Sequence, residues 1–288
     1  MPTRDERKAA AKQNLALMRG AFANETKATI DGAIVYEDGE GRTLELPEVE
    51  EGAQTATRVT SDFAIKVVHR EKGRIVVVDP CSFTRPGGAY EDGSFGPEQI
   101  LCSESNLYPV LEGMKAAYHD GNRGYSSGQL FTDRAMYLPN VAFVHDGDIA
   151  HADVLAIPEP NRTRALENHR SEAEASVALA NRIETILRIA AAQGAETLII
   201  GAFGSGPQGF GAQVVIELFQ AWFAAHPGAI GSVVFAVPRA AYDAFNDAFG
   251  EEVVVEDAAP AEDVSEAEDE DEYDFDPNDL PEGVTFRS

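Results

Sequence analysis

Two short apolar runs, each followed by a glycine-rich loop and a helical pattern, constrain the fold of this chain most strongly. The first run, IVVVD at residues 75–79, leads into a loop at residues 80–97, and the second, at residues 197–200, leads into a loop at residues 201–211. A compact run of β-branched residues is typical of a strand that is buried on both faces of a sheet. The repeated order of strand, glycine loop and helix therefore predicts an α/β domain.

Other periodicities place further elements around these runs. Helices are expected at residues 4–22, 98–114, 169–193, 214–225 and 240–249, and further strands at residues 28–36, 42–46, 140–144, 153–157 and 232–237. The helix over residues 169–193 is expected to bury one apolar face. That face consists of Val177, Ala180, Ile183, Leu187 and Ala190. Strands that alternate with helices over residues 140–250 indicate a mostly parallel or mixed sheet flanked by helices.

The charge of the chain is concentrated at its C-terminal end. The net charge is −26, and residues 251–288 hold 16 Asp and Glu against a single Arg. Such a composition predicts a disordered acidic tail, which either keeps the protein soluble or docks on a basic partner through Phe275 and Phe286. An acidic body also argues against direct binding to nucleic acid, but it leaves open a small anionic ligand held by backbone amides.

Cysteine content and hydropathy exclude several other classes of protein. The two cysteines, Cys81 and Cys102, are too few for a disulfide scaffold or a Cys-rich zinc site. No metal and no other cofactor is expected, since His, Cys and carboxylates are not clustered at ligand spacing. No apolar run approaches membrane-spanning length, and the N-terminal residues lack the apolar region of a signal peptide. We therefore expect a soluble cytoplasmic protein that does not bind a membrane.

The two glycine-rich loops are the candidate ligand-binding elements. The first reads PGGAYEDGSFGPEQ over residues 86–99, and the second reads GAFGSGPQGFG over residues 201–211. Glycine lets the backbone approach a ligand closely, and the amides that open the next helix favour a phosphate or a carboxylate. Neither loop fits a Walker A or a dinucleotide-binding pattern. Because ligands of open α/β sheets lie beyond the carboxyl ends of the strands, the loops predict a cleft for a diphosphate.

The order of residues in these loops resembles that of the microbial-type poly(ADP-ribose) glycohydrolases, a branch of the macrodomain fold. Their pattern P-G-G-G-x-x-x-G-x-x-x-Q-E-E-x-L-C, with L-Y a few residues on, is similar without a gap to DPCSFTRPGGAYEDGSFGPEQILCSESNLY. The shared residues are Pro86, Gly87, Gly88, Gly93, Glu98, Leu101, Cys102, Leu107 and Tyr108. The second loop, IIGAFGSG, resembles the family run L-G-A-F-G-C-G. The resemblance covers about residues 4–250.

This resemblance implies a fold, a ligand and an organisation of the chain. It implies a macrodomain-like mixed sheet flanked by helices, with a helical accessory region at residues 1–74, an ADP-ribose-binding domain at residues 75–250, and the acidic tail at residues 251–288. The implied partner is ADP-ribose or an ADP-ribosylated protein, and the implied reaction is hydrolysis of ADP-ribose O-glycosidic linkages. Glu98 is the implied acid/base group. The implied substrate-binding residues are Asp79, Gly87, Gly88, Ala89, Gln99, Gly201, Ala202, Phe203, Gly204, Ser205, Gly206 and Phe210.

Three positions depart from the family pattern and keep alternatives open. Gln99 replaces the second glutamate, which is usually held to be catalytic, Asp79 replaces an asparagine, and Gln208 replaces an aromatic residue. A neutral amide cannot give or take the proton that glycosidic cleavage needs. Either Glu98 has taken over this work, or the protein binds ADP-ribose without cleaving it. A third hypothesis is an enzyme that acts on a different nucleotide-ribosyl bond.

Overall fold

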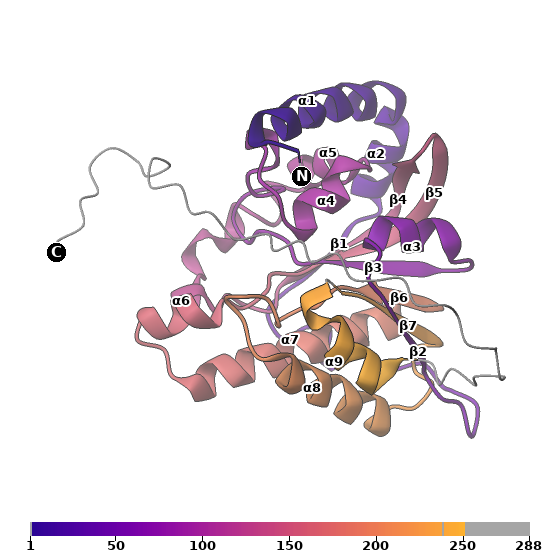
Figure 1. Ribbon diagram of the computed structural model, residues 1–288, viewed down its shortest axis with the longest axis vertical. Coiled ribbons are helices and arrows are strands. Elements are labelled where there is room, and N and C mark those ends of the chain that lie inside the picture. Colours follow the sequence, from indigo (N-terminus) through magenta and orange to yellow (C-terminus); the bar gives the residue numbers. More distant parts are fainter. Residues whose placement is uncertain (1, 238, 251–288) are drawn as a thin grey trace, which may run out of the picture. The chain divides into compact units, whose positions relative to one another are not determined.

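The computed structural model describes residues 2–237 and 239–250, so the expected acidic tail lies outside the described residues. A seven-stranded sheet with the order β1-β4-β5-β3-β6-β7-β2 forms its centre (Figure 1). The strands are β1 (Ile34–Tyr36), β2 (Ala56–Thr60), β3 (Ile75–Asp79), β4 (Ala135–His145), β5 (Asp148–Ala156), β6 (Thr197–Ile200) and β7 (Ser232–Ala236). Strand β4 is antiparallel to β1 and β5, and the other neighbours are parallel. The expected mixed sheet of the α/β class is confirmed.

Helices cover both faces of the sheet (Figure 1). On one face lie α1 (Arg4–Ala21), α2 (Ala23–Asp31), α3 (Ala64–Arg70), α4 (Pro97–Ser103) and α5 (Leu107–Gly113). On the other lie α7 (Glu172–Ala192), α8 (Ala212–Ala225) and α9 (Arg239–Phe249), and the short α6 (Arg162–Glu167) precedes α7. None of the helices in the described ranges is long and apolar enough to cross a membrane.

The branched apolar run at residues 75–79 forms the centre of both hydrophobic layers. Ile75 and Val77 pack in the cluster beneath α1, α3, α4 and α5, whereas Val76 and Val78 pack in the cluster beneath α7, α8 and α9. All five residues of β3 are buried. Because side chains alternate along a strand, β3 contributes residues to the hydrophobic clusters on both faces of the sheet, as the sequence predicted.

Local signals in the sequence explain where the longest helices begin. Thr3 opens α1 and Ser171 opens α7, and each forms a capping box with the glutamate three residues later, Glu6 and Glu174 respectively. These reciprocal bonds satisfy backbone N–H groups that the first turn of a helix leaves free. Pro97 occupies the start of α4, where its missing N–H group costs nothing.

The N-terminal segment differs from the expectation of two strands around a turn. Residues 28–31 belong to α2, the strand β1 spans only Ile34–Tyr36, and residues 41–43 form a 3₁₀ turn instead of part of a strand at 42–46. Sequence reasoning also missed β2, which lies at the edge of the sheet beside β7. The first 74 residues thus contribute two strands to the central sheet, and Met1–Glu251 form one compact unit.

The single helix expected at residues 98–114 is two helices, α4 and α5. At the break, Ser105 Oγ donates to the carbonyl of Leu101 and accepts from the amide of Leu107. Asn106 pairs with β4, because its side-chain oxygen accepts from the amide of Ala142 and its own amide donates to the Ala142 carbonyl. Side chains that bond to nearby backbone compete with helical bonds, which ends α4 here.

The hairpin of β4 and β5 is longer than the two short strands expected at residues 140–144 and 153–157. It begins at Ala135 and contains an irregularity in register between Leu138 and Val141. Asn140 lies there with a φ of +56°, a conformation that asparagine tolerates better than most residues. This local irregularity interrupts the period-two pattern that would have revealed the whole strand.

The apolar face of α7 is rotated relative to the expected one. Val177 is 58% exposed, whereas Leu179 is fully buried beneath the sheet. Ile183, Leu187 and Ala190 are buried as expected, and Ala180 is partly buried. Leu179 and Ile183 are four residues apart and share one side of the helix, so this pair defines the buried stripe.

Substitutions on α7 distinguish the two faces. Leu179→Ala removes a fully buried side chain and is expected to lower the free energy of unfolding by about 2–5 kcal/mol. Val177→Ala on the exposed side is expected to change it by about 0.5 kcal/mol or less. Urea unfolding at equilibrium measures both values. Equal losses from the two variants would contradict the placement of this helix.

Candidate active site

The two glycine-rich loops leave the sheet at the same edge. The first follows the carboxyl end of β3 and the second follows the carboxyl end of β6, and these two strands are parallel neighbours in the sheet. The carboxyl ends of parallel strands form one edge, where ligands of α/β proteins bind. The structure therefore brings the two predicted loops together, as Figure 1 shows.

Two glycines of the first loop permit the backbone to approach the carboxyl group of Glu98. Gly87 and Gly88 have φ angles of +60° and +57°, which side chains other than glycine rarely adopt. A Cβ atom on Gly88 would lie 2.6 Å from Ser82 Oγ and 3.2 Å from Glu98 Oε2. A Cβ atom on Gly87 would lie 2.4 Å from the ring of Tyr108. The loop conformation thus requires glycine at both positions.

Glu98 lies in the first turn of α4 and is only 3% exposed. Its Oε2 accepts hydrogen bonds from Ser82 Oγ at 2.6 Å and from Gln99 Nε2 at 3.3 Å. Its Oε1 is buried and has no hydrogen-bond partner among the described residues. Burial raises the pKa of Glu98 to about 7, although hydrogen bonds from Ser82 and from the Gly87 amide act in the opposite direction. The carboxyl group is therefore poised to exchange a proton near neutral pH.

Asp79 is a second buried carboxyl group at the carboxyl end of β3. It is fully buried, and within the described ranges neither of its oxygens has a hydrogen-bond partner. Burial, and then the nearby charge of Glu98, raise the pKa of Asp79 well above its usual range. The two carboxyl groups therefore titrate as a pair.

Gln99 ties the first loop to α4. Its Nε2 donates to the carbonyl of Gly87 at 3.1 Å and to Glu98 Oε2 at 3.3 Å. A carboxylate at this position could not donate either bond. The amide therefore fixes the position of the glutamate beside it. Ala89, which follows the two glycines, is partly buried at the start of a 3₁₀ turn.

The second loop holds a carboxylate on one of its amides. The amide of Gly204 donates a hydrogen bond to Glu159, whose pKa is raised by burial. Gly204 has a φ of +81°, and its carbonyl accepts from the amide of Phe210 at 2.6 Å. Ser205 Oγ donates to the carbonyl of Ala202 at 2.9 Å, which closes the turn. This loop therefore already presents a backbone donor to an anionic oxygen.

The two aromatic residues of the second loop point into the core. Phe203 and Phe210 are 4% and 8% exposed, and both belong to the hydrophobic cluster beneath α7, α8 and α9. Gly201 and Gly206, at the two ends of the turn, are both partly buried. Backbone groups of this loop are therefore more accessible to a ligand than its aromatic rings are.

Sequence reasoning missed three polar residues near these loops: Ser82, Glu159 and His119. His119 is fully buried, and burial lowers its pKa to about 4, so it is neutral at physiological pH. Glu159 lies just beyond β5 in the run PEPN, and its position after an expected strand was the sequence signal that could have identified it.

The described residues around the loops give no sign of a nucleophile or of a metal site. His119 is neutral, and the thiols of Cys81 and Cys102 are free and buried, so none of the three is activated as a nucleophile. In the part of the chain that the structure describes, no group of three or more His, Cys, Asp and Glu is placed to hold a metal ion.

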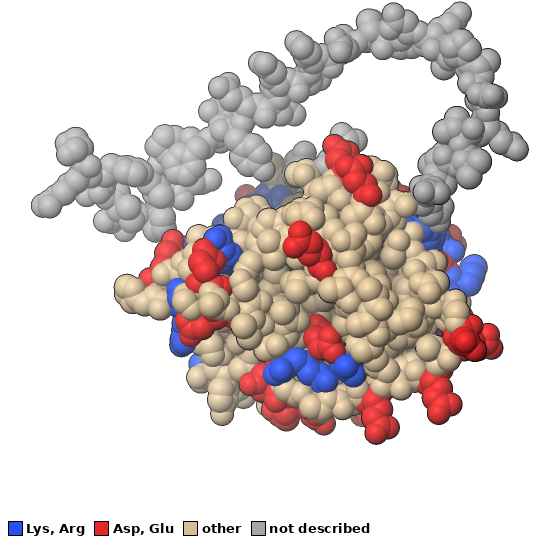
Figure 2. All heavy atoms as spheres, turned by 90° about the horizontal axis from the view of Figure 1, so that it is seen from below, with Lys and Arg blue, Asp and Glu red and all other residues tan. Residues whose placement is uncertain are grey.

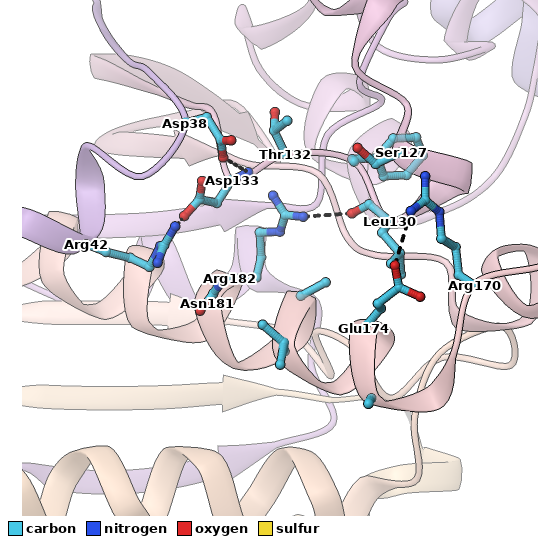
Figure 3. Close-up of a pocket in the computed structure, with 14 residues that line it drawn as sticks. Asp38, Arg42, Ser127, Leu130, Thr132, Asp133, Arg170, Glu174, Asn181 and Arg182 are labelled. Atoms are coloured by element: carbon cyan, nitrogen blue, oxygen red, sulfur yellow. Dashed lines mark hydrogen bonds and ion pairs between the residues drawn. The ribbon is translucent and has the colours of Figure 1, made fainter.

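A separate pocket of about 510 Å³ lies between α7 and residues 127–133 (Figure 3). Asp38 and Arg42, which follow β1, complete its wall. Its described lining includes no residue of either glycine-rich loop. The pocket is therefore a different feature from the edge of the sheet that carries Glu98.

The surface offers no broad basic region on the side that lies below the sheet in Figure 1. Figure 2 shows this side of the described chain: acidic side chains are scattered over it, and basic ones gather in small groups beside them. A nucleic-acid backbone is typically held by a continuous basic surface. The sequence-based expectation of a small anionic ligand stays a prediction.

One comparison with known proteins matches the part of the chain that contains the first loop. The family model of the microbial-type PARG catalytic domain, PARG being poly(ADP-ribose) glycohydrolase, matches residues 8–146. No curated protein matches the sequence. The matched segment contains β3, the first glycine-rich loop and α4.

Solved structures with similar folds are bacterial poly(ADP-ribose) glycohydrolases. The enzyme from Thermomonospora curvata has a TM-score of 0.75 and 24% identity, and the match covers 84% of this chain and 99% of that one. The same enzyme bound to the inhibitor ADP-HPD has a TM-score of 0.71 and 23% identity, with coverages of 83% and 97%. The enzyme from Deinococcus radiodurans in complex with ADP-ribose has a TM-score of 0.67 and 23% identity, with coverages of 77% and 95%.

The sheet, its helical layers and the two loops define an α/β protein with the fold of these bacterial enzymes. The resemblance to the microbial-type PARG family is thereby confirmed, in the sequence of residues 8–146 and in the fold of the chain. The family match supports the expectation of a glycoside hydrolase that acts on ADP-ribose linkages.

The buried state of Glu98 predicts how stability depends on pH. Its pKa is raised from 4.5 to about 7, so between these values the folded protein binds more protons than the unfolded chain. The stability that the protonated carboxyl confers is present below pH 4.5 and is lost as the pH rises through 7. Relative to Glu98→Gln, the wild type should therefore lose up to about 1.4 kcal/mol per pH unit across this window.

Urea unfolding at several pH values between 5 and 7 measures this difference. Glu48→Gln, at an exposed position, is the control and should leave the pH dependence of the wild type unchanged. Parallel curves for the wild type and Glu98→Gln would show that the carboxyl group is not held in its protonated form.

Proposed function

We propose that the protein hydrolyses ADP-ribose O-glycosidic linkages, with Glu98 as its acid/base group. The observation that carries this proposal is the buried carboxyl of Glu98, held by Ser82 beside a glycine loop in the segment that matches the PARG catalytic domain. Similar structures carry ADP-ribose or the inhibitor ADP-HPD. The substrate would therefore be the polymer or an ADP-ribosylated protein, bound across the two loops.

Cleavage of a glycosidic bond passes through a state with the character of an oxocarbenium ion. A carboxylic acid protonates the leaving oxygen, and a second polar group activates water. With a pKa of about 7, Glu98 holds a proton in part of the population near neutral pH and returns to the carboxylate after donating it. Oε2 is bound by Ser82 and Gln99, whereas the buried Oε1 has no partner among the described residues, and we assign proton transfer to Oε1.

Gln99 requires that any second carboxyl group come from another part of the site. The Gln99 amide cannot transfer a proton, and its N–H groups are used by Gly87 and Glu98. We infer that Asp79 is the second carboxyl group, because both of its oxygens lack partners among the described residues and it is electrostatically coupled to Glu98. A pair of coupled carboxyl groups keeps one proton while the other group is ionised, which supplies one acid and one base.

The backbone of the second loop would hold the diphosphate. The Gly204 amide already donates to a carboxyl oxygen, that of Glu159, which supports a role for this amide as a donor to an oxygen of the ligand. Backbone amides bind phosphate without lysine or arginine, in keeping with an acidic chain. Gly201, Ala202, Phe203, Ser205, Gly206 and Phe210 would shape this loop around the ligand, as Gly87, Gly88 and Ala89 would shape the first.

The second candidate function is a module that binds ADP-ribose without cleaving it. Gln99 favours this alternative, since the position usually held to be catalytic in the family carries no acid. Under this hypothesis the Asp79–Glu98 pair contacts the ribose but transfers no proton. Both hypotheses predict that the protein binds ADP-ribose, but only the first predicts that it cleaves the linkage.

Release of ADP-ribose from a poly(ADP-ribosyl)ated protein distinguishes the two functions. The wild type is expected to release ADP-ribose, and Glu98→Gln to reduce the rate by about 10²–10⁴-fold, the usual contribution of acid–base catalysis. Asp79→Asn should also slow release, and the double variant Asp79→Asn/Gln99→Glu should recover part of the loss by returning a carboxyl group to the site. Asp92→Asn, an exposed carboxyl of the same loop, is the matched control and should keep the wild-type rate.

Binding of ADP-ribose, measured by thermal stabilisation, is followed in the same variants. A wild type that is stabilised by ADP-ribose and releases none would establish the binding module, and Gln99→Glu should then gain turnover. If Gln99→Glu binds and stays inert, the missing acid at this position does not explain the lack of activity. Wild-type rates in folded Glu98→Gln would overturn the assignment of Glu98.

A further inference from the structure

The pocket beside α7 has the size and construction of a small-molecule site. Its volume of about 510 Å³ lies within the usual range for ligand pockets. Three separate segments line it: the turn after β1, residues 127–133 ahead of β4, and the first half of α7 (Figure 3). A pocket built from distant parts of the sequence is fixed by the fold rather than by one mobile loop.

Arg182 is the buried cation of this pocket. It is 1% exposed, and its Nη2 donates to the carbonyl of Leu130 at 2.8 Å. Its Nε and Nη1 are also buried, and no acceptor among the described residues contacts them. Burial lowers the pKa of Arg182 to about 10, so the guanidinium still carries its charge at neutral pH. A guanidinium has donors only, and it can be satisfied only by an acceptor oxygen.

The carboxylates in the pocket are already bound to other donors. Asp133 accepts from Arg42 Nε at 2.6 Å, from Thr185 Oγ at 3.0 Å and from the Gly39 amide at 2.8 Å. It therefore attracts Arg182 through space without a hydrogen bond to it.

The other ionisable groups of the pocket are paired with one another or with the backbone. Arg170 is paired with Glu174 at 3.1 Å. Asp38 accepts from the Asp133 amide at 3.2 Å, and its neighbour Asp133 raises the pKa of Asp38. Arg182 is thus the cation of the pocket whose donors Nε and Nη1 have no acceptor among the described residues, and these are the donors that an incoming anion would meet.

Part of the wall of the pocket is apolar, beside the polar side chains of Ser127, Thr132 and Asn181. It is formed by Leu130, Phe131, Ala173, Val177 and Ala178. Val177 is 58% exposed at the pocket, and Thr132 adds a buried hydroxyl that has no partner in the described part of the chain. The buried guanidinium of Arg182 and the apolar side chains beside it would suit a small molecule with an anionic group and a short apolar body.

We propose that this pocket is a second ligand site, separate from the glycine-rich loops, in which Arg182 receives the carboxylate or phosphate group of a small apolar molecule. Carboxylate and phosphate share the chemistry that a guanidinium recognises. The walls on α7 and residues 127–133 would select the size of the apolar body.

Calorimetric titration of the full chain with phenyl phosphate, benzoate and inorganic phosphate tests the site. The first two probes share a ring and differ in the anionic group, and the third has no ring. At least one of the two aromatic probes is expected to bind with a millimolar or lower Kd and more tightly than inorganic phosphate. Arg182→Met, which keeps the length of the side chain without its charge, should weaken that binding by about tenfold or more.

A second pair of variants keeps the test decisive if Arg182→Met does not fold. Val177→Glu places a negative charge at the pocket and should weaken binding of the anionic probe several-fold. Val214→Glu introduces the same change at a 43% exposed valine of α8 outside the pocket, and should leave the affinity unchanged. Circular dichroism confirms that each variant is folded.

Three outcomes would overturn the proposal. One is that none of the three probes binds to the folded wild type. Another is binding that Arg182→Met and Val177→Glu leave unchanged, which would place the probe elsewhere, for instance on the glycine-rich loops. The third is equal weakening by Val177→Glu and Val214→Glu, which would reflect overall charge rather than this pocket.

Discussion

Burial of β3 on both faces is the constraint on which the rest of the structure depends. Because both layers of helices pack on this strand, its carboxyl end lies deep between them, and Asp79 is fully buried there. Helix α4 returns over the same end of the sheet and carries Glu98 into the same low-dielectric region. Removal of water raises the pKa of both carboxyl groups, which would otherwise be ionised surface acids. The fold therefore sets the proton affinity of the candidate site, and the side chains alone do not.

The residues at positions 79 and 99, which both depart from the family pattern, both act on Glu98. An amide at position 99 can donate to the Gly87 carbonyl and to Glu98, so it holds the loop closed over the glutamate. An acid at position 79 adds a carboxyl group within electrostatic range of the same glutamate. The number of carboxyl groups in the site is thus two, as in the paired glutamates of the family pattern, although they come from a strand and a helix. Two carboxyl groups are what the proposed hydrolysis requires.

Sequence reasoning succeeded where a local signal decides the structure. The branched run at residues 75–79, the glycine-rich loops and the helix at 169–193 follow from periodicity and from turn residues. It failed where distant residues decide: Asn106 ends a helix because it pairs with β4, and β2 forms a strand because β7 offers an edge. Glu98 and Asp79 were accessible from the sequence as candidates, but their mutual coupling depends on burial that no motif encodes. The unpartnered nitrogens of Arg182 carry no sequence signal at all, since an arginine within an apolar helical pattern is typical of a solvated position.

The two proposed sites would bind an anion through different groups: backbone amides at the glycine-rich loops, and the guanidinium of Arg182 in the pocket beside α7. At the glycine-rich loops, amides such as that of Gly204 donate hydrogen bonds without adding a charge near Glu98. A lysine or arginine there would stabilise the carboxylates of Asp79 and Glu98 and lower their pKa values, which would remove the acid that glycosidic cleavage needs. Arg182 instead lies in a pocket whose lining includes neither glycine-rich loop. A ligand held by backbone amides at these loops therefore suits the proposed acid chemistry better than one held by an arginine would.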